Sequence, residues 1–338
     1  MGSNSTTVQN LTQRSPFCQS LTVNQGWTYR DRVTQLFAGY TVLNYYSYRY
    51  RHSSREQWRD RILAGQILCN GAAIAPETPL QNGQNLTYHR PPWIEPSVPL
   101  AFQVLYQDAD LLAIAKPAGL PVLPGGSFVQ NTLLHLLQQR YPQDTPVPVH
   151  RLGRGTSGIM LLARSPLAKA HLSRQMRQSS QNLGKPRSLR KLYRALVGPF
   201  TPGHNLGDRF VLTAPIGKVP HPELGYLYGA HPDGSPAHSD GRVLTRWRDR
   251  TLLEMDIHTG RPHQIRIHLA AAGYPLLGDP LYLPGGSPRL RPAPGQTKLP
   301  VPSDIGYWLH AWELTFVHPR TEKSLAIACE PPSELQPH

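Results

Sequence analysis

The sequence predicts an α+β protein in which strands outnumber the helices between them. The run "IMLLA" at 159–163 is apolar over the length of a strand, as in strands buried on both faces. The segment "LLEMDIH" at 252–258 alternates apolar and polar residues, which is typical of a strand with one buried face. A segment between 54 and 65 and another at 260–273 instead repeat apolar residues at helical spacing. At 338 residues the chain is long enough for more than one domain.

The start of the chain is expected to contain a tail, a compact unit and a linker. Residues 1–25 are polar and lack periodicity, which predicts a disordered tail. Residues 26–92 are expected to form a small folded unit. Residues 93–100 are rich in proline and predict a linker to the main domain, which is expected over 101–335.

Within the unit at 26–92, a helix and a hairpin are predicted. Trp58 and Ile62 lie one helical turn apart, and Gly65 provides an end for the helix. In "QILCNGAAI" the pair Asn70-Gly71 predicts the turn of a hairpin.

The main domain is predicted as strands separated by loops and two helices. Residues 103–116 read as two short strands around a turn at Asp108–Asp110, followed by a Lys-Pro-Ala-Gly loop. A helix begins at Ser165-Pro166, because Ser caps helix N-termini and Pro favours the first helical position. The remaining expected elements are a basic loop at 178–190, a strand at 191–198, a long surface loop at 284–303 and a closing strand at 309–319.

Charge and cysteine content narrow the class of protein. Lys and Arg total 35 against 21 acidic residues, for a net charge of +14, which predicts attraction to polyanions such as nucleic acid. The three cysteines lack zinc-ligand or disulfide spacing, so we expect a reducing compartment, the cytoplasm or an organelle if the source is eukaryotic. No run of about 18 apolar residues is present, so no membrane association is expected. No cofactor or metal site is predicted.

Five motifs, in order, carry a family resemblance. They are "LLAIAKPAGLPV" (111–122), "HRLGRGTSGIMLLARS" (150–165), "KLYRALVG" (191–198), "TGRPHQIRIHLAAAGYPLLGDPLY" (259–282) and "LHAWELTFVHP" (309–319). Together they resemble the RluA family of RNA pseudouridine synthases, and the "HRLGRGTSG" form resembles a plant- and cyanobacterial-like subgroup. Residues 54–90 resemble an S4-like RNA-binding module.

The resemblance implies a pseudouridine-synthase fold, a mixed and mainly antiparallel sheet with flanking helices, preceded by the S4-like α/β module. It implies a cofactor-free isomerase that breaks the uracil N1 to ribose C1′ bond and rejoins the base through C5. In the family, an Asp acts at the sugar, a Tyr packs on the base and an Arg pairs with the Asp. By position these are Gly153, Tyr193 and Arg266.

Gly153 is the departure from the family pattern, because glycine has no carboxylate. Without one, Arg266 would lack its partner unless another acid supplies the charge. One interpretation is a synthase whose carboxylate comes from elsewhere, with Asp279, Asp256 or Asp144 as donors. A second is a catalytically impaired protein that still binds RNA, and a third is a subgroup that works by a modified route. The synthase is the preferred interpretation.

The expected partner is structured RNA, ribosomal or transfer, and the chain is expected to be a monomer without an obligate protein partner. The residues expected to contact RNA are Arg151, Arg154, Thr156, Lys116, Arg261, Arg55 and Arg59. Alone, such arginines are ordinary solvated surface residues and Tyr193 is an ordinary core aromatic; the motifs favour the functional interpretation. His150 is expected to be a structural hydrogen-bonding residue.

Overall fold

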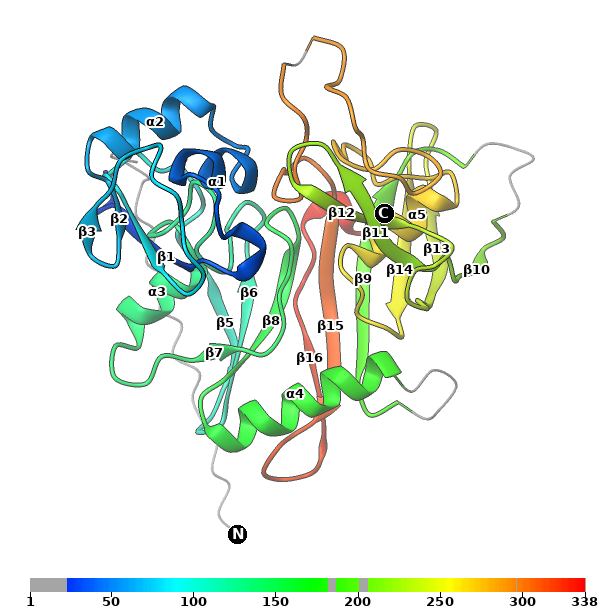
Figure 1. Cartoon of the computed structure of the whole chain (residues 1–338). Coiled ribbons are helices and arrows are strands. Elements are labelled where there is room, and N and C mark those ends of the chain that lie inside the picture. The colour runs from blue at the N-terminus through cyan, green and yellow to red at the C-terminus, as the bar shows by residue number, and fades with distance from the viewer. Residues whose placement is uncertain (1–22, 182–186, 201–205, 296, 338) are drawn as a thin grey trace.

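The computed structural model describes residues 23–181, 187–200, 206–295 and 297–337 (Figure 1). The predicted tail therefore lies mostly outside the described residues. Its last residues are ordered, however: Asn24 is buried and donates to Glu95 at 2.8 Å. No described helix has both the length and the apolar character needed to cross a bilayer.

A small four-stranded antiparallel sheet with two helices forms the first unit. Its strands are β1 (Trp27–Arg32), β4 (Asn85–Arg90), β2 (Ile67–Cys69) and β3 (Ala72–Ala73), in that spatial order. Helices α1 (Val42–Arg49) and α2 (Arg55–Leu63) pack on it through a core rich in aromatic side chains. Tyr46 and Trp58 have ring centroids 4.9 Å apart at the centre of this core.

Neighbouring residues explain where α2 begins and ends and where the following hairpin turns. Ser54 caps the helix in a reciprocal capping box with Gln57, which satisfies two otherwise unpaired backbone donors. Gly65 has φ +69°, a conformation that glycine adopts without steric cost. The turn between β2 and β3 lies at Asn70-Gly71, as expected from the sequence.

The predicted linker at 93–100 is not a free spacer. Glu95 is only 3 % exposed and its carboxylate accepts hydrogen bonds from the backbone N–H groups of Val129, Gln130 and Asn131 at 2.8–2.9 Å. A buried carboxylate that binds several backbone donors fixes its segment in place. The proline-rich composition did not reveal this anchor.

The main domain is built on a ten-stranded sheet with the order β10-β13-β14-β9-β15-β8-β6-β5, to which β16 and β7 add at β15 and β8. All its pairs are antiparallel except β15 with β8. The mixed, mainly antiparallel sheet of an α+β fold is thus confirmed. The strands are β5 (Gln103–Gln107), β6 (Leu111–Lys116), β7 (Val147–Pro148), β8 (Ser157–Ala163), β9 (Arg190–Val197), β10 (Arg209–Leu212), β13 (Ser239–Arg246), β14 (Thr251–Ile257), β15 (Leu309–Val317) and β16 (Ser324–Ala328).

Helices cover both faces of this sheet. On one face α4 (Pro166–Gln181) packs Ala168 and Leu172 against β6, β8 and β15, and Figure 1 shows it crossing the lower end of the sheet. On the other face α3 (Leu133–Arg140) and α5 (Gln264–Ala271) bury Leu137 and Leu269 in the largest hydrophobic cluster. This second face also carries Tyr193 and Tyr307.

Several elements differ from the sequence prediction. Helix α4 continues into the expected loop at 178–190, and residues 182–186 lie outside the described part. The strands β11 (Ile216–His221) and β12 (Gly225–Ala230) form a separate hairpin that no periodicity indicated. The described part of 284–303 contains no helix or strand, as expected for a surface loop. Elsewhere in the described chain, two short 3-10 helices lie at Gln35–Phe37 and Ser333–Leu335.

Candidate active site

The parallel pairing of β8 with β15 brings two distant segments together. His310 lies beside Ser157 and Ala311 beside Gly158, so the residues just before each strand enter the sheet from the same end. The segment 153–156 therefore lies next to Tyr307. On the other side of β15, Ala311 pairs with Tyr193 of β9. One end of the sheet thus holds the Gly153 loop and Tyr307, with Tyr193 one strand away.

Tyr307 occupies the space in front of Gly153. A Cβ atom placed on Gly153 would lie 2.8 Å from the Tyr307 hydroxyl and 3.5 Å from Thr156 Oγ1. A Cβ on Gly155 would lie 2.8 Å from the Tyr307 ring atoms Cε1 and Cζ. At such distances the tyrosine or the loop would have to shift to accommodate a side chain. Both glycines therefore make room for the tyrosine that packs against them.

Arg266 has a carboxylate partner even though Gly153 does not supply one. That partner is Asp279. The Arg266 Nε donates to Asp279 Oδ2 at 2.7 Å and its Nη2 to Oδ1 at 2.8 Å, and the two side chains are 2 % and 0 % exposed. The guanidinium also lies 4.2 Å from the centroid of the Tyr307 ring, a cation–π distance. A buried charge needs such pairing to be tolerated.

Asp279 itself is not a free carboxylate. Besides its two bonds to Arg266, it accepts the backbone N–H groups of Leu281 at 2.8 Å and Tyr282 at 3.2 Å. Four donors on two oxygens leave little lone-pair capacity for a substrate. Asp279 is best described as the structural partner of Arg266.

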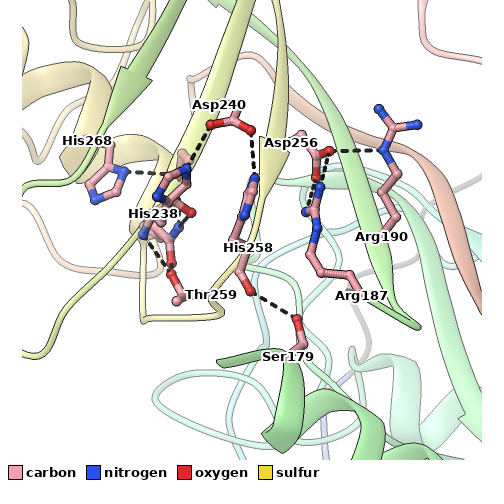
Figure 2. Close-up of polar contacts among 11 residues, drawn as sticks. Ser179, Arg187, Arg190, His238, Asp240, Asp256, His258, Thr259 and His268 are labelled. Carbon is pink, nitrogen blue, oxygen red and sulfur yellow. Dashed lines mark hydrogen bonds and ion pairs between the residues drawn. The ribbon is translucent and has the colours of Figure 1, made fainter. Parts of the chain in front are cut away.

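The other two candidate carboxylates are also engaged. Arg187 donates twice to Asp256, at 2.9 and 3.0 Å, and Arg190 once at 2.9 Å, which Figure 2 shows as a fork around the carboxylate. Asp144 is exposed and pairs with Arg164 at 3.7 Å. Neither is among the atoms within 4 Å of a Cβ at Gly153, so neither replaces the motif carboxylate at its place in the site.

Tyr193 lies in the same hydrophobic cluster as Tyr307 and Leu152. Its side chain is 9 % exposed, and burial raises the pKa of its phenol to about 12. The tyrosine is therefore neutral at physiological pH.

Two residues predicted to bind RNA are buried instead. Lys116 is 1 % exposed, and its Nζ donates to the carbonyl oxygens of Pro117, Leu120 and Arg154 at 2.8, 2.9 and 3.3 Å. Burial lowers the pKa of this amine to about 7, with a smaller contribution from the charge of Arg154. Thr156 is also buried and contacts Tyr307. Both residues support the loop in this structure, and their assignment as RNA contacts stays a prediction.

The arginines that were predicted to bind RNA differ in their exposure to solvent. Arg151 is exposed, whereas Arg154 is half-buried, stacks 4.6 Å from the Phe128 ring centroid and donates to the Gly119 carbonyl at 3.0 Å. Arg261 is half-buried and donates to the Pro236 carbonyl at 2.9 Å. Arg55 and Arg59 are exposed on α2 in the separate first unit.

A cluster of possible metal ligands was not indicated by the sequence analysis. His238, Asp240 and His258 place donor atoms within 4.8 Å of one another (Figure 2). The two imidazole Nε2 atoms each contact a different oxygen of Asp240, at 2.8 and 2.7 Å. These hydrogen bonds account for the arrangement without an ion. The only sequence hint is the His-x-Asp spacing, which is common outside metal sites.

Tyr307 was also missed, because it is one aromatic residue at the end of a proline- and glycine-rich stretch. His150, in contrast, behaves as expected: its Nε2 accepts the backbone N–H of Leu161 at 3.0 Å. That contact requires a neutral nitrogen, and burial lowers the pKa of the imidazole to about 4.

Comparison of this sequence with known proteins identifies the family to which the chain belongs. Residues 110–271 match the model of the RNA pseudouridylate synthase family. An uncharacterized RNA pseudouridine synthase of Synechocystis sp. is 49% identical over 87% of this chain and 95% of its own length, and RNA pseudouridine synthase 5 of Oryza sativa is 41% identical over 93% and 89%. Ribosomal large subunit pseudouridine synthase D of Nitrosomonas europaea is 35% identical over 71% of this chain and 64% of its own length. The chain belongs to the RluA family of RNA pseudouridine synthases.

Proposed function

We propose that this protein converts specific uridines of structured RNA, ribosomal or transfer, into pseudouridine without a cofactor. The observation that carries the proposal is the convergence of the family's motif positions. The loop at 153–156 and the buried Arg266 come from separate parts of the sequence and both contact Tyr307. Tyr193 lies in the same hydrophobic cluster, opposite Ala311 of β15.

For this reaction the protein must hold the extruded base and stabilise the ribose as its C1′ reacts. The C1′–N1 bond of the uridine breaks, uracil turns, and a C1′–C5 bond forms while C5 loses its hydrogen. The target nucleotide must leave its stack, which costs a few kcal/mol. In this proposal Tyr193 offers an aromatic face to uracil, while Arg266 supplies a fixed positive charge beside the ribose site.

The free protein holds this site closed. Tyr193, Tyr307 and Arg266 are 9 %, 5 % and 2 % exposed. Arg266 also reaches the carbonyl of Pro302, and Arg154 that of Ser303, each at 3.5 Å. In the proposed cycle the segment around Pro302 and Ser303 moves to admit the nucleotide while Tyr307 stays beside the Gly153 loop. Exposed basic residues such as Arg151, Arg55 and Arg59 bind backbone phosphates. We propose a monomer that acts in the cytoplasm, or in an organelle if the source is eukaryotic.

The second candidate is an RNA-binding protein without catalysis on the same fold. Gly153 favours it, because losing a group that acts at the reacting carbon costs several powers of ten in rate. The engagement of Asp279, Asp256 and Asp144 with arginines adds to this argument. The same test separates the two candidates.

The test uses ribosomal and transfer RNA labelled with tritium at uridine C5, incubated with the purified protein. Tritium release into water is expected from the parent, and Arg266→Ala is expected to abolish it. Tight, salt-sensitive RNA binding with no release from any RNA pool would instead establish the binding protein.

A further inference from the structure

We propose that Tyr307 is the catalytic residue that replaces the missing motif carboxylate, and that its phenol oxygen meets the ribose C1′ of the target uridine. This inference rests on the proposed synthase function and identifies the group that acts in it. Three observations carry it: the position of the phenol, its polar and cationic neighbours, and the commitment of the candidate carboxylates.

The position follows from the glycine loop. The atoms within 4 Å of a Cβ on Gly153 are the hydroxyls of Tyr307 and Thr156, at 2.8 and 3.5 Å, leaving out the neighbouring residues in the chain. An Asp at this position would begin at that Cβ, where the phenol oxygen leaves too little room for it. Gly153 does not have a positive φ, so its backbone does not explain why the residue is glycine. The need for space beside Tyr307 does explain it.

The neighbours of Tyr307 suit a reactive phenol. Its hydroxyl lies 3.2 Å from Thr156 Oγ1, which orients the oxygen toward the loop. The Arg266 guanidinium lies 4.2 Å from the ring centroid, and Asp279 fixes the guanidinium through two bonds. A cation at this distance stabilises negative charge that develops on the ring oxygen. In this arrangement the family's arginine acts on the phenol rather than on a motif carboxylate.

The reaction balances without another reactant. The Tyr307 oxygen forms a bond to C1′ as the C1′–N1 bond breaks, and the phenol proton passes to N1 of the departing uracil. Uracil then turns, and C5 attacks C1′ while the C1′–O bond breaks. The phenolate accepts the hydrogen released from C5 and exchanges it with water. The N1–H gained in the first step is the one that pseudouridine retains, so the enzyme returns unchanged.

Tyr307→Phe tests the role of the oxygen, because it keeps the ring that fills the glycine slot and stacks on Arg266. Single-turnover tritium release is measured for the parent, Tyr307→Phe and the control Tyr106→Phe. The control removes a phenol that bonds Asp108 at 2.7 Å, on β5 at the edge of the sheet. At least a hundred-fold loss is expected in Tyr307→Phe, with unchanged RNA affinity, and at most a two-fold change in the control. A rate within about three-fold of the parent in Tyr307→Phe overturns the inference and leaves the synthase function standing.

A second arm tests whether Tyr307 and the missing carboxylate share one position. Tyr307→Ala removes the phenol and opens the slot; adding Gly153→Asp to it then supplies a carboxylate to the same space. At least a ten-fold recovery of tritium release over Tyr307→Ala alone is expected. No recovery in a double variant that folds and binds RNA as the parent does would contradict the shared position. Absence of release from the parent itself would reject the synthase function, and the role of Tyr307 with it.

Discussion

The buried pair of Arg266 and Asp279 offers the sharpest test of the site's architecture. We predict that Asp279→Asn destabilises the main domain by about 3–5 kcal/mol, the usual cost of leaving a buried charge without its partner. We expect a destabilisation within this range because the Arg266 and Asp279 side chains are 2 % and 0 % exposed. They are joined by two hydrogen bonds of 2.7 and 2.8 Å. The Asn amide would also turn an N–H donor toward the guanidinium or toward the backbone donors.

The assay is urea unfolding at pH 7, followed by fluorescence, with each transition fitted separately. With a denaturant slope of about 3 kcal/mol per molar, the midpoint should fall by more than about 1 M. Asp144→Asn is the matched control: its ion pair to Arg164 spans 3.7 Å with the carboxylate 61% exposed, and such exposed pairs contribute about 0–1 kcal/mol.

The double variant Asp279→Asn, Arg266→Gln separates charge from packing. Removing both charges eliminates the unpaired guanidinium, so the double loss should be smaller than the sum of the single losses by at least about 1 kcal/mol. A cost below about 1 kcal/mol for Asp279→Asn alone would refute the description of Asp279 as a structural partner and restore it as a free carboxylate.

Three further predictions concern packing, protonation and RNA contact. Gly153→Ala should destabilise the protein by about 1–3 kcal/mol by overpacking against the Tyr307 hydroxyl, measured by urea unfolding; an unchanged midpoint would contradict the close approach. His268 is 1 % exposed and burial lowers its pKa to about 4, below the unfolded value, so the protein binds fewer protons folded than unfolded between about pH 6.5 and 4. Stability should therefore be lost as pH falls through that window, by about 3 kcal/mol from this group, and His268→Asn should flatten the profile. The double change Arg55→Ala, Arg59→Ala should lower the slope of log affinity against log salt by about 1–2; an unchanged slope would remove α2 from the RNA surface.

Local patterns in the sequence determined much of the fold and the family. The apolar run at 159–163, the helix start at Ser165-Pro166 and the Asn70-Gly71 turn depend on neighbouring residues, so they appear in the sequence directly. The five ordered motifs identified the RluA family and the positions of Tyr193, Arg266 and Gly153. These are properties of the chain read a few residues at a time.

The tertiary structure decided what lies in the place of the missing carboxylate. Tyr307 meets Gly153 only because β15 pairs in parallel with β8, a strand order that no local periodicity encodes. The same limit hid the burial of Lys116, whose amine lies among loop carbonyls. Burial and partners arise from long-range packing, because each depends on segments that the sequence separates and the sheet brings together.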